Sequence, residues 1–451
     1  MNMYKPPKPG SKIIIVGGGC FGLSTAHALA LKKIYQVVVF DRLPIPVPDA
    51  ASSDISKAVR FDYGNNLLYM NLTLEAMPYW HQWNKERAIQ NEPPVFHQTG
   101  VLLFGHQGKF GDYELESMKA IREAGYGHCI EELLTPEAIL KKYPHFEETV
   151  KNSYDIAYFN KEGGWCNSSE AIKHLYGKCI KEGVQFVIGQ DQGCYKELWI
   201  EDNSDVRGII TRDGQHHIAD NVIFATGAWT AGLLGINEEL LATGQVVMHF
   251  KPNKSNLQAL MDQPVWCADV ANTGYYGFPA NEDGKLKIAR HHSGYLNPRS
   301  GDDISIPRTQ VDHANDTIPI SALQHARTFL GKFLPMTSSM DITYTRVCWY
   351  SDSKDGDFLI CPHPNYSNVV IASGDSGHAM KMLPVIGYKI CHVIEGIDSD
   401  YSRAWCWRTT IEEKFDAFRG RIENVRTTLG DQDGGGRFAT QHELLAAKHR
   451  L

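Results

Sequence analysis

The sequence predicts an α/β protein in which a Rossmann-like dinucleotide-binding domain is interrupted by an α+β substrate domain of mixed sheet plus helices. Three observations predict this fold class: a strand–turn–helix–strand unit over 12–41, a second buried strand with a Gly turn over 222–229, and alternating strand patterns over 240–300. The chain of 451 residues is also longer than one hydrophobic core ordinarily organises, so two domains are expected.

The first unit begins with a continuous apolar run, KIIIV (12–16), which is typical of a strand buried on both faces. The turn GGGCFG follows, then LSTAHALALKK with helical spacing, and then the strand QVVVF, which ends at an acid. Glycines at these positions allow a tight turn, close approach of the backbone to a pyrophosphate, and close helix–strand packing. The free N–H groups at the helix start favour the diphosphate, and the acid accepts the ribose hydroxyls. The unit therefore predicts a dinucleotide site formed by Gly17, Gly19, Cys20, Phe21, Gly22 and Asp41.

The order of the later elements predicts that the dinucleotide domain is discontinuous. Its predicted pieces are residues 1–62, 151–240 and 336–400, and the substrate domain takes 63–150 and 241–335. The pattern of the first substrate segment is largely helical, whereas VVMHF, GYYGF and KLKIAR in the second indicate antiparallel strands joined by turns such as EDG. The remaining residues, 401–451, form a polar tail in which DQDGGGR is expected to be flexible.

The composition excludes several classes of function. A net charge of −7 provides no basic stripe, so no nucleic-acid partner is expected. No apolar run reaches the roughly 18–20 residues that span a bilayer, so no membrane partner is expected either. The 10 Cys and 19 His show no CxxC or HExxH spacing, which predicts reduced thiols and no metal site. The final His-Arg-Leu weakly resembles a peroxisomal address; a cytoplasmic protein with a frayed helix end is the alternative.

Both NAD and FAD use the glycine motif, so the motif alone leaves the dinucleotide open. Its early position, with a second Gly turn (Ala225-Thr226-Gly227) much later, resembles FAD enzymes of the glutathione-reductase type. Four motifs then occur in order: GGGCFGLSTA, SKAVRFDYG (56–64), YYGFP…KLKIARH (275–291) and CWY…GDSGHAMK (348–381). From about residue 11 to 395 the chain thereby resembles the monomeric sarcosine oxidase family, which includes pipecolate, saccharopine, N-methyl amino acid and fungal fructosyl amino acid oxidases. The resemblance implies FAD as the cofactor.

In that family the Cys of the CWY motif is joined through a thioether to the 8α-methyl group of FAD, and the resemblance implies the same for Cys348. Without the resemblance, a buried Cys that packs as a small apolar residue would be expected. The turn Gly374–Gly377, at an expected helix start, is implied to lie over the flavin, where its N–H groups would stabilise negative charge on the reduced ring. Further cofactor contacts are implied for Arg42, Ser56, Lys57, Asp375, Gly377, His378 and Lys381.

The resemblance also implies a pair of cations that hold the substrate. In sarcosine-type enzymes an Arg and a Lys at the positions of Arg60 and Lys381 bind the substrate carboxylate, and a guanidinium suits this role because it binds carboxylates in a bidentate way. A Lys at the position of Lys287 helps dioxygen accept electrons, because a cation stabilises the charged superoxide formed first; Lys285 is the alternative. The family lines its substrate pocket with side chains that match Tyr276, His291 and Tyr350.

These features predict an FAD-dependent amine oxidoreductase that oxidises the CH–NH bond of a secondary L-amino acid such as sarcosine, pipecolate, saccharopine or an N-methyl amino acid. The products would be an imine, which water hydrolyses, and H2O2 from dioxygen. The alternative is a fructosyl amino acid oxidase, in which a Glu helps to bind the sugar where this chain has Phe278, and which lacks the Arg at the position of Arg60. More distant alternatives are an NAD-dependent dehydrogenase and a non-catalytic flavoprotein. A monomer is expected.

Overall fold

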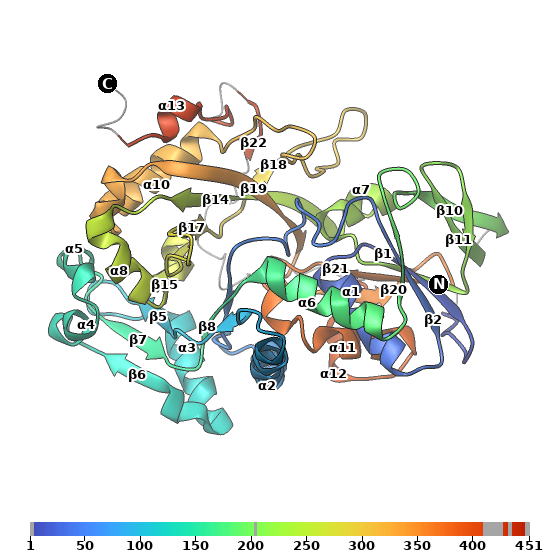
Figure 1. Cartoon of the computed structure of the whole chain (residues 1–451), viewed down its shortest axis with the longest axis horizontal. Coiled ribbons are helices and arrows are strands. Elements are labelled where there is room, and N and C mark those ends of the chain that lie inside the picture. The colour runs from blue at the N-terminus through green and yellow to red at the C-terminus, as the bar shows by residue number, and fades with distance from the viewer. Residues whose placement is uncertain (1–3, 203–204, 409–426, 432–434, 447–451) are drawn as a thin grey trace.

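The computed structural model describes residues 4–202, 205–408, 427–431 and 435–446, and Figure 1 shows their arrangement around two sheets. The smaller sheet carries the N-terminal motif and has six strands, which are parallel apart from β20 at one edge. In spatial order these strands are β20 (Leu359–Pro362), β21 (Val369–Ser373), β13 (Asn221–Phe224), β1 (Lys12–Val16), β2 (Gln36–Asp41) and β9 (Gln185–Ile188).

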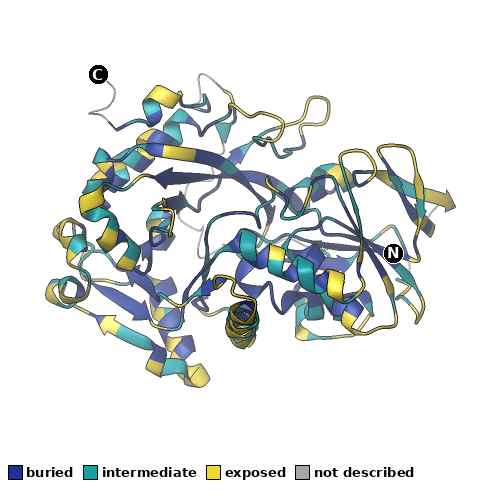
Figure 2. Cartoon of the chain, in the orientation of Figure 1, coloured by how far each residue is buried: buried dark blue, intermediate teal, exposed yellow. Residues whose placement is uncertain are grey.

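Different layers cover the two faces of this smaller sheet. Helices α1 (Cys20–Leu31), α6 (Ser168–Lys181) and α11 (Ile386–Ile394) pack together on one face, as Figure 1 shows. The other face packs against a three-stranded sheet of β10 (Tyr195–Asp202), β11 (Asp205–Thr211) and β12 (His216–Ile218). The central strands are therefore buried on both sides (Figure 2), which explains why their sequences are continuous apolar runs.

The larger sheet has ten strands and forms the substrate domain. Its strands in spatial order are β22 (Thr427–Thr428), β18 (Tyr295–Leu296), β14 (Leu240–Phe250), β17 (Leu286–Arg290), β16 (Tyr275–Gly277), β15 (Val265–Ala268), β5 (Val101–Phe104), β7 (Ala157–Asn160) and β6 (Ile130–Leu133), and β19 (Ile342–Ser353) pairs with β14. The antiparallel pairing of β14 with β17 and of β16 with β17 agrees with the strands expected over 240–300. The pair β14–β19 runs antiparallel from Leu240↔Ser353 to Phe250↔Ile342 and reaches from this sheet toward the smaller one.

The remaining elements complete the two domains. A small sheet contains β3 (Lys57–Val59), β8 (Gly164–Cys166) and β4 (Phe96–His97). The other helices are α2 (Leu67–Ile89), α3 (Asp112–Ile121), α4 (Pro136–Lys142), α5 (Glu147–Lys151), α7 (Thr230–Leu234), α8 (Lys254–Asp262), α9 (Val270–Thr273), α10 (Ile320–Phe333), α12 (Asp400–Ala404) and α13 (Gln441–Leu444). Short helical turns are η1 (Arg122–Tyr126), η2 (Gly127–Cys129), η3 (Pro144–Phe146), η4 (Gly227–Trp229), η5 (Pro335–Ser339) and η6 (Met380–Met382).

The domain boundaries differ from those expected from the sequence at three places. Strands β7 and β19 belong to the larger sheet, although 151–240 and 336–400 were assigned to the dinucleotide domain. Helix α2 packs its Trp80 and Trp83 into the core that contains α1, although it lies in a segment assigned to the substrate domain. These exchanges have one physical cause: long-range pairing and packing, rather than order along the chain, decide to which core an element belongs.

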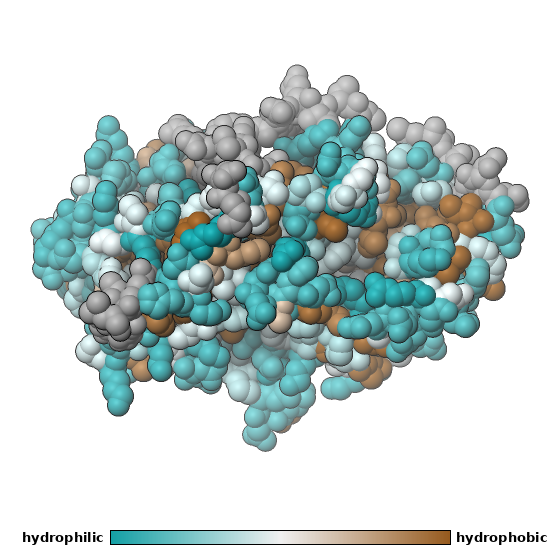
Figure 3. Space-filling model, turned by 90° about the horizontal axis from the view of Figure 1, so that it is seen from above, coloured by the Kyte–Doolittle hydropathy of each residue, from teal (hydrophilic) through white to brown (hydrophobic). Residues whose placement is uncertain are grey.

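The tail beyond 400 is partly structured. Trp405 is fully buried and β22 pairs with β18, so these parts of the predicted tail belong to the domains. The expected flexible stretch DQDGGGR lies partly, and the final His-Arg-Leu wholly, outside the described residues. No helix in the described ranges is long and apolar enough to cross a membrane. Figure 3 shows hydrophilic residues over much of one face, with apolar residues in separate groups between them.

Glu114 on α3 provides a test of the packing, because its side chain is 1% exposed and burial raises its pKa to about 7. A carboxyl group whose pKa is higher in the folded than in the unfolded chain stabilises the fold fully below its unfolded pKa, and this stability is lost as the pH rises through the folded pKa. We expect Glu114→Gln to match the wild type near pH 4.5 and to be more stable by about 3 kcal/mol at pH 8. Urea unfolding of both proteins at the two pH values measures this difference. A difference that is the same at both pH values would contradict the expectation.

Candidate active site

The glycine-rich turn between β1 and α1 leaves room for a ligand at the start of the helix. Gly17 has a φ of +106°, and a Cβ atom there would lie 2.4 Å from the carbonyl oxygen of Ala225. A Cβ atom on Gly22 would lie 1.9 Å from the carbonyl oxygen of Gly17, so this glycine allows α1 to pack against the turn. No side chain of a described residue caps α1 at Gly19. The first N–H groups of α1 are therefore available to an anionic group.

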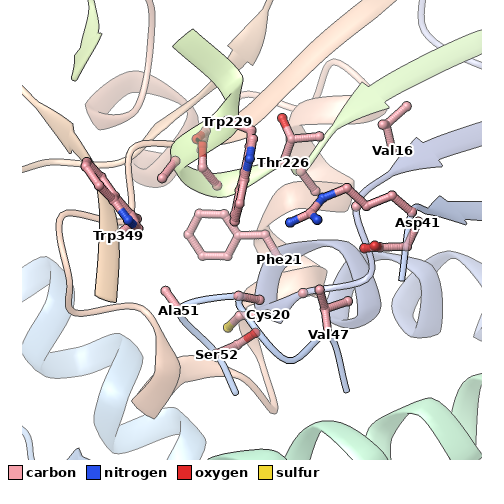
Figure 4. Close-up of a pocket in the computed structure, with 18 of the residues that line it drawn as sticks. Val16, Cys20, Phe21, Asp41, Val47, Ala51, Ser52, Thr226, Trp229 and Trp349 are labelled. Carbon is pink, nitrogen blue, oxygen red and sulfur yellow. Dashed lines mark hydrogen bonds between the residues drawn. The ribbon is translucent and has the colours of Figure 1, made fainter. Parts of the chain in front are cut away.

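A cavity of about 400 Å³ opens at this turn and is called the dinucleotide cavity below. Figure 4 shows Val16 and Asp41 at one end and Trp349 at the other, with Phe21 and Trp229 between them. Most of the predicted cofactor residues line this cavity: Gly17, Gly19, Cys20, Phe21, Asp41, Arg42, Lys57, Asp375 and Gly377.

The polar end of the dinucleotide cavity is built at the end of β2. Asp41 accepts a hydrogen bond from the N–H of Gly18 at 2.7 Å, and burial raises the pKa of its carboxyl group. Arg42 forms an ion pair with Asp49 at 2.7 Å, and its guanidinium lies 4.7 Å from the centre of the Trp229 ring. The acid predicted for the ribose thus lines the cavity, and the cation beside it is fixed by a partner and an aromatic face.

A second cavity, of about 380 Å³, contains both predicted substrate cations and is called the fork cavity. It shares Lys57, Tyr350, Gly377 and Met380 with the dinucleotide cavity, so the two cavities meet at these residues. The predicted residues that line the fork cavity are Lys57, Arg60, Tyr276, His291, Tyr350, Gly377, His378 and Lys381. Residues from five separate parts of the chain therefore converge on one space.

Arg60 and Lys381 are both buried in the wall of the fork cavity. The Arg60 guanidinium donates to the hydroxyl of Tyr113 at 2.5 Å and to the carbonyl oxygen of Asp62. The Lys381 ammonium donates to the hydroxyl of Tyr63 at 3.0 Å and to the carbonyl oxygen of His378 at 3.1 Å.

The charge state of Lys381 depends on its surroundings. Burial, reinforced by the nearby Arg60, holds the pKa of Lys381 well below its usual value. The carboxylate of Asp62 accepts hydrogen bonds from Tyr158 at 2.8 Å and Asn160 at 3.0 Å. A ligand carboxylate in the fork cavity would restore the charged form of Lys381, because an opposite charge favours ionisation.

Lys287 lies behind the junction of the two cavities and lines neither. It is 1% exposed on β17, and its ammonium forms an ion pair with Asp54 at 2.6 Å. Burial lowers the pKa of Lys287 to about 8. Burial alone would raise the pKa of Asp54, but Lys287 and the neighbouring Lys57 hold it well below its usual value. The alternative, Lys285, is exposed, precedes the strand and pairs with Asp283, so it is remote from both cavities.

Cys348 lies on β19 where the two cavities meet, although it lines neither. Its side chain is 1% exposed and packs beside Ala51, Tyr276 and Tyr350. The ammonium of Lys57 lies 3.9 Å from its sulfur. The thiol is therefore buried next to a cation and lies two residues from Tyr350, which lines both cavities.

The turn after β21 contributes Gly377 to the wall that both cavities share. Gly374 and Gly377 have φ values of +72° and +76°, and a Cβ atom on Gly377 would lie 2.1 Å from the Tyr350 ring. Asp375 accepts a hydrogen bond from the N–H of Ser351, and burial raises the pKa of its carboxyl group to about 6. The sequence placed a helix start here, which is wrong: the turn is followed by η6 and α11 begins at Ile386. Its N–H groups therefore belong to a turn and not to a helix terminus.

Sequence reasoning missed several residues that organise the site. Asp54, Tyr63 and Tyr113 hold Lys287, Lys381 and Arg60, respectively. Tyr63 lies inside the motif SKAVRFDYG and Asp54 lies two residues before it, and this placement was the signal that could have indicated them. Tyr113 carried none, because only the packing of α3 brings it to Arg60.

Two other predicted residues have structural surroundings of their own. The carbonyl oxygen of Ser56 accepts a hydrogen bond from Lys287, and His378 stacks on Phe358 with ring centres 4.8 Å apart. Outside both cavities, the ligand atoms of His128, Cys129 and Glu162 lie within 4.8 Å of one another and could hold a metal ion, a group that no sequence spacing indicated.

A long bipartite ligand fits this pair of cavities. The close approach required at Gly17, the uncapped start of α1 and the acid at the end of β2 suit a diphosphate and a ribose. The far end opens at Tyr350 and Gly377 into the fork cavity, so the reactive end of such a cofactor would face a second ligand. The fold and the cavities together define a dinucleotide-dependent oxidoreductase.

The chain belongs to the FAD dependent oxidoreductase (DAO) family, whose model matches residues 12–392. It is 32% identical to the L-saccharopine oxidase of Schizosaccharomyces pombe over 88% of this chain and 93% of that one. It is 28% identical to a monomeric sarcosine oxidase of Bacillus sp. over 83% and 90% of the two chains. The structure of the fructosyl peptide oxidase from E. terrenum superimposes with a TM-score of 0.83, at 27% identity, over 95% of this chain and 98% of that one. The predicted family, fold class and FAD dependence are therefore confirmed.

Proposed function

We propose that the chain is an oxidase of secondary L-amino acids that uses FAD, takes dioxygen as the acceptor and produces H2O2. The observation that carries the proposal is the pair Arg60 and Lys381 in a buried cavity that meets the dinucleotide cavity. Two cations in a poorly solvated site bind a carboxylate through strong, charge-assisted hydrogen bonds. Sarcosine and saccharopine, named for the relatives, are both secondary amines that carry a carboxylate.

The fork fixes the carboxylate and thereby the orientation of the amine. With the carboxylate between Arg60 and Lys381, the nitrogen and its neighbouring carbon extend toward the wall formed by Tyr276 and Tyr350. An uncharged amine suits a cavity that already contains Lys57 and the two cations of the fork, because a fourth positive group there would be repelled. Bound FAD would supply the electron acceptor. The C–H bond beside the nitrogen would break with its hydrogen and electron pair leaving the substrate, and the resulting iminium would lose its N–H proton to give an imine that water hydrolyses.

Lys287 provides the positive charge for the dioxygen half of the reaction. Its pKa of about 8 keeps it protonated at neutral pH, and its ion pair with Asp54 fixes its position. Dioxygen receives two electrons and two protons to become H2O2, and a fixed cation stabilises the negative charge that develops on oxygen. Lys57, 3.7 Å from Asp54, joins this charged group to the walls of both cavities.

Deglycation of fructosyl amino acids is the second candidate, and the similarity to fructosyl peptide oxidase structures favours it. Phe278 stands at the position of the Glu that helps to bind the sugar in the resembling oxidases. It is buried, and its ring centre lies 4.9 Å from the Lys287 ammonium. It does not line the fork cavity. The secondary amino acid is therefore the better supported substrate.

Anaerobic bleaching of the flavin absorbance tests the proposal directly. The purified holoenzyme is mixed with sarcosine, pipecolate, proline, N-methyl amino acids, saccharopine or fructosyl-valine in the absence of oxygen. Rapid bleaching by one of the first five supports the proposal. Bleaching by fructosyl-valine alone would reject it in favour of deglycation.

A covalent bond between the Cys348 sulfur and the 8α-methyl group of FAD is part of the proposal, supported by the position of the thiol beside Lys57. We expect flavin to stay with the wild-type chain after acid precipitation and to be released from Cys348→Ala. Cys361, which is also buried but lies on β20 and lines neither cavity, gives the matched control Cys361→Ala, which should retain its flavin. Flavin fluorescence of the denatured chain on a gel detects the covalent bond between Cys348 and FAD. Release of flavin from the wild type would show that FAD is held without it.

A further inference from the structure

The outer wall of the fork cavity carries an acid that the proposed reaction does not use. Glu116 lies on α3, three residues after Tyr113, whose hydroxyl contacts Arg60. Residues three apart on a helix share a face, so Glu116 continues the wall about one turn, or about 5 Å, beyond the contact with the fork. Its carboxylate packs over Gly64, beside the exposed Asn65 at the cavity edge.

The charge of Glu116 is not balanced by the protein. Among the residues that the structure describes, none forms a hydrogen bond or an ion pair with its carboxylate. Asp355, which also lines the fork cavity, behaves differently, because Arg408 forms an ion pair with it at 2.9 Å and both side chains are largely buried. A half-buried carboxylate in a cavity is stabilised by a positive charge. Because no described residue pairs with the Glu116 carboxylate, that charge would have to come from a ligand.

We propose that Glu116 binds a second, cationic amino group of the substrate, so that the preferred substrates are secondary amino acids with an ammonium group on the side chain or the N-substituent. The inference rests on the proposed function, because it takes the carboxylate held by Arg60 and Lys381 as its fixed point. A cavity of about 380 Å³ is in the range of pockets that hold ligands much larger than a single small amino acid. A ligand with a carboxylate at one end and an ammonium group at the other matches the two charged parts of this wall, the Arg60–Lys381 pair and Glu116.

Binding without turnover gives the first test. The probes are 6-aminohexanoate and hexanoate, which share a carboxylate and chain length and differ in the distal ammonium group. Their dissociation constants are measured from the perturbation of the flavin spectrum in the oxidised holoenzyme. We expect 6-aminohexanoate to bind about tenfold more tightly to the wild type, and this preference to disappear in Glu116→Gln, because one charge-assisted hydrogen bond is worth this much.

Turnover gives the second test, with Nα-methyl-L-lysine and Nα-methyl-L-norleucine as the matched substrates. Glu116→Gln should lower kcat/KM for the lysine derivative about tenfold and leave that for the norleucine derivative unchanged. Glu282→Gln, which removes an acid from the exposed turn before β17, is the control with the same change in net charge and should behave as the wild type.

The outcomes separate this inference from the proposed function. If both N-methyl amino acids bleach the flavin but show no preference, or if the preference survives in Glu116→Gln, the role of Glu116 is wrong and the amine oxidase proposal stands. If a hydroxyl-rich fructosyl amino acid shows the dependence on Glu116 instead, the cationic group is also wrong. If none of the secondary amines bleaches the flavin, the proposed function fails and the inference fails with it.

Discussion

We expect Lys287→Met to slow the reaction of the reduced enzyme with dioxygen by about 10²–10³-fold and to leave anaerobic reduction by substrate nearly unchanged. The reason is geometric: Lys287 lines neither the fork cavity nor the dinucleotide cavity, so it does not hold the substrate. Its ammonium is a fixed charge, set by the ion pair with Asp54 at 2.6 Å, and that charge is of use when negative charge develops on oxygen. Stopped-flow measurement of the two half-reactions separates the effects.

The pH dependence gives a second signature of the same lysine. Because the pKa of Lys287 is lowered to about 8, the cation is present below that pH and is lost as the pH rises through it. The rate of reoxidation in the wild type should therefore fall above about pH 8, whereas that of Lys287→Met should show no such fall. A slow reoxidation that still falls with the same apparent pKa in the variant would assign the titration to another group.

Two controls separate the role of Lys287 in reoxidation from a loss of stability. Removing Lys287 leaves Asp54 as a buried charge with a weaker set of partners, which costs stability. The double variant Lys287→Met/Asp54→Asn removes both charges and should regain stability while its reoxidation stays slow. Lys285→Met changes an exposed lysine two residues away and should leave both half-reactions unaltered. Equal loss of both half-reactions in Lys287→Met alone would contradict the assigned role.

The N-terminal unit could be predicted from the sequence because its signals are local. The buried run of β1, the glycines and the acid at the end of β2 each report on contacts within one βαβ unit. The pairing of β14 with β19 could not be predicted in this way. Its two strands are separated by almost a hundred residues, and nothing in either segment states its partner. The domain boundary at 336 failed for this reason.

The residues of the site divide along the same line. Arg60, Lys381 and Cys348 were found through the resemblance of their motifs, since each by itself would have been taken as a surface cation or a core thiol. The structure adds the partners that fix them: Tyr113 on α3 and Tyr63 before α2. Such partners depend on how α2 and α3 pack, which periodicity alone does not reveal. The sequence therefore predicted the candidate residues, and the structure shows which neighbours orient them.

Replacing Arg60 by Met should raise KM for the amino acid substrate by about 10²–10³-fold. Two charge-assisted hydrogen bonds to a buried carboxylate account for a loss of this size. Arg60→Lys should recover part of it, because a lysine keeps the charge but not the planar fork. Arg299→Met, which removes an exposed arginine paired with Asp302, is the matched control and should leave KM unchanged.

The methyl ester of the same substrate shows whether Arg60 acts on the carboxylate or only supports the wall. In the wild type the free acid should be strongly preferred over its ester, and in Arg60→Met this preference should fall by most of the change seen in KM. A merely structural role would lower kcat/KM for acid and ester alike. Proton uptake on binding gives a further test at Lys381. Burial beside Arg60 holds the pKa of Lys381 well below its usual value, and a bound carboxylate raises this pKa again. At a pH above the lowered pKa, binding of the free acid should therefore take up a proton, whereas binding of the ester should not. Calorimetry in buffers of different ionisation enthalpy measures this uptake.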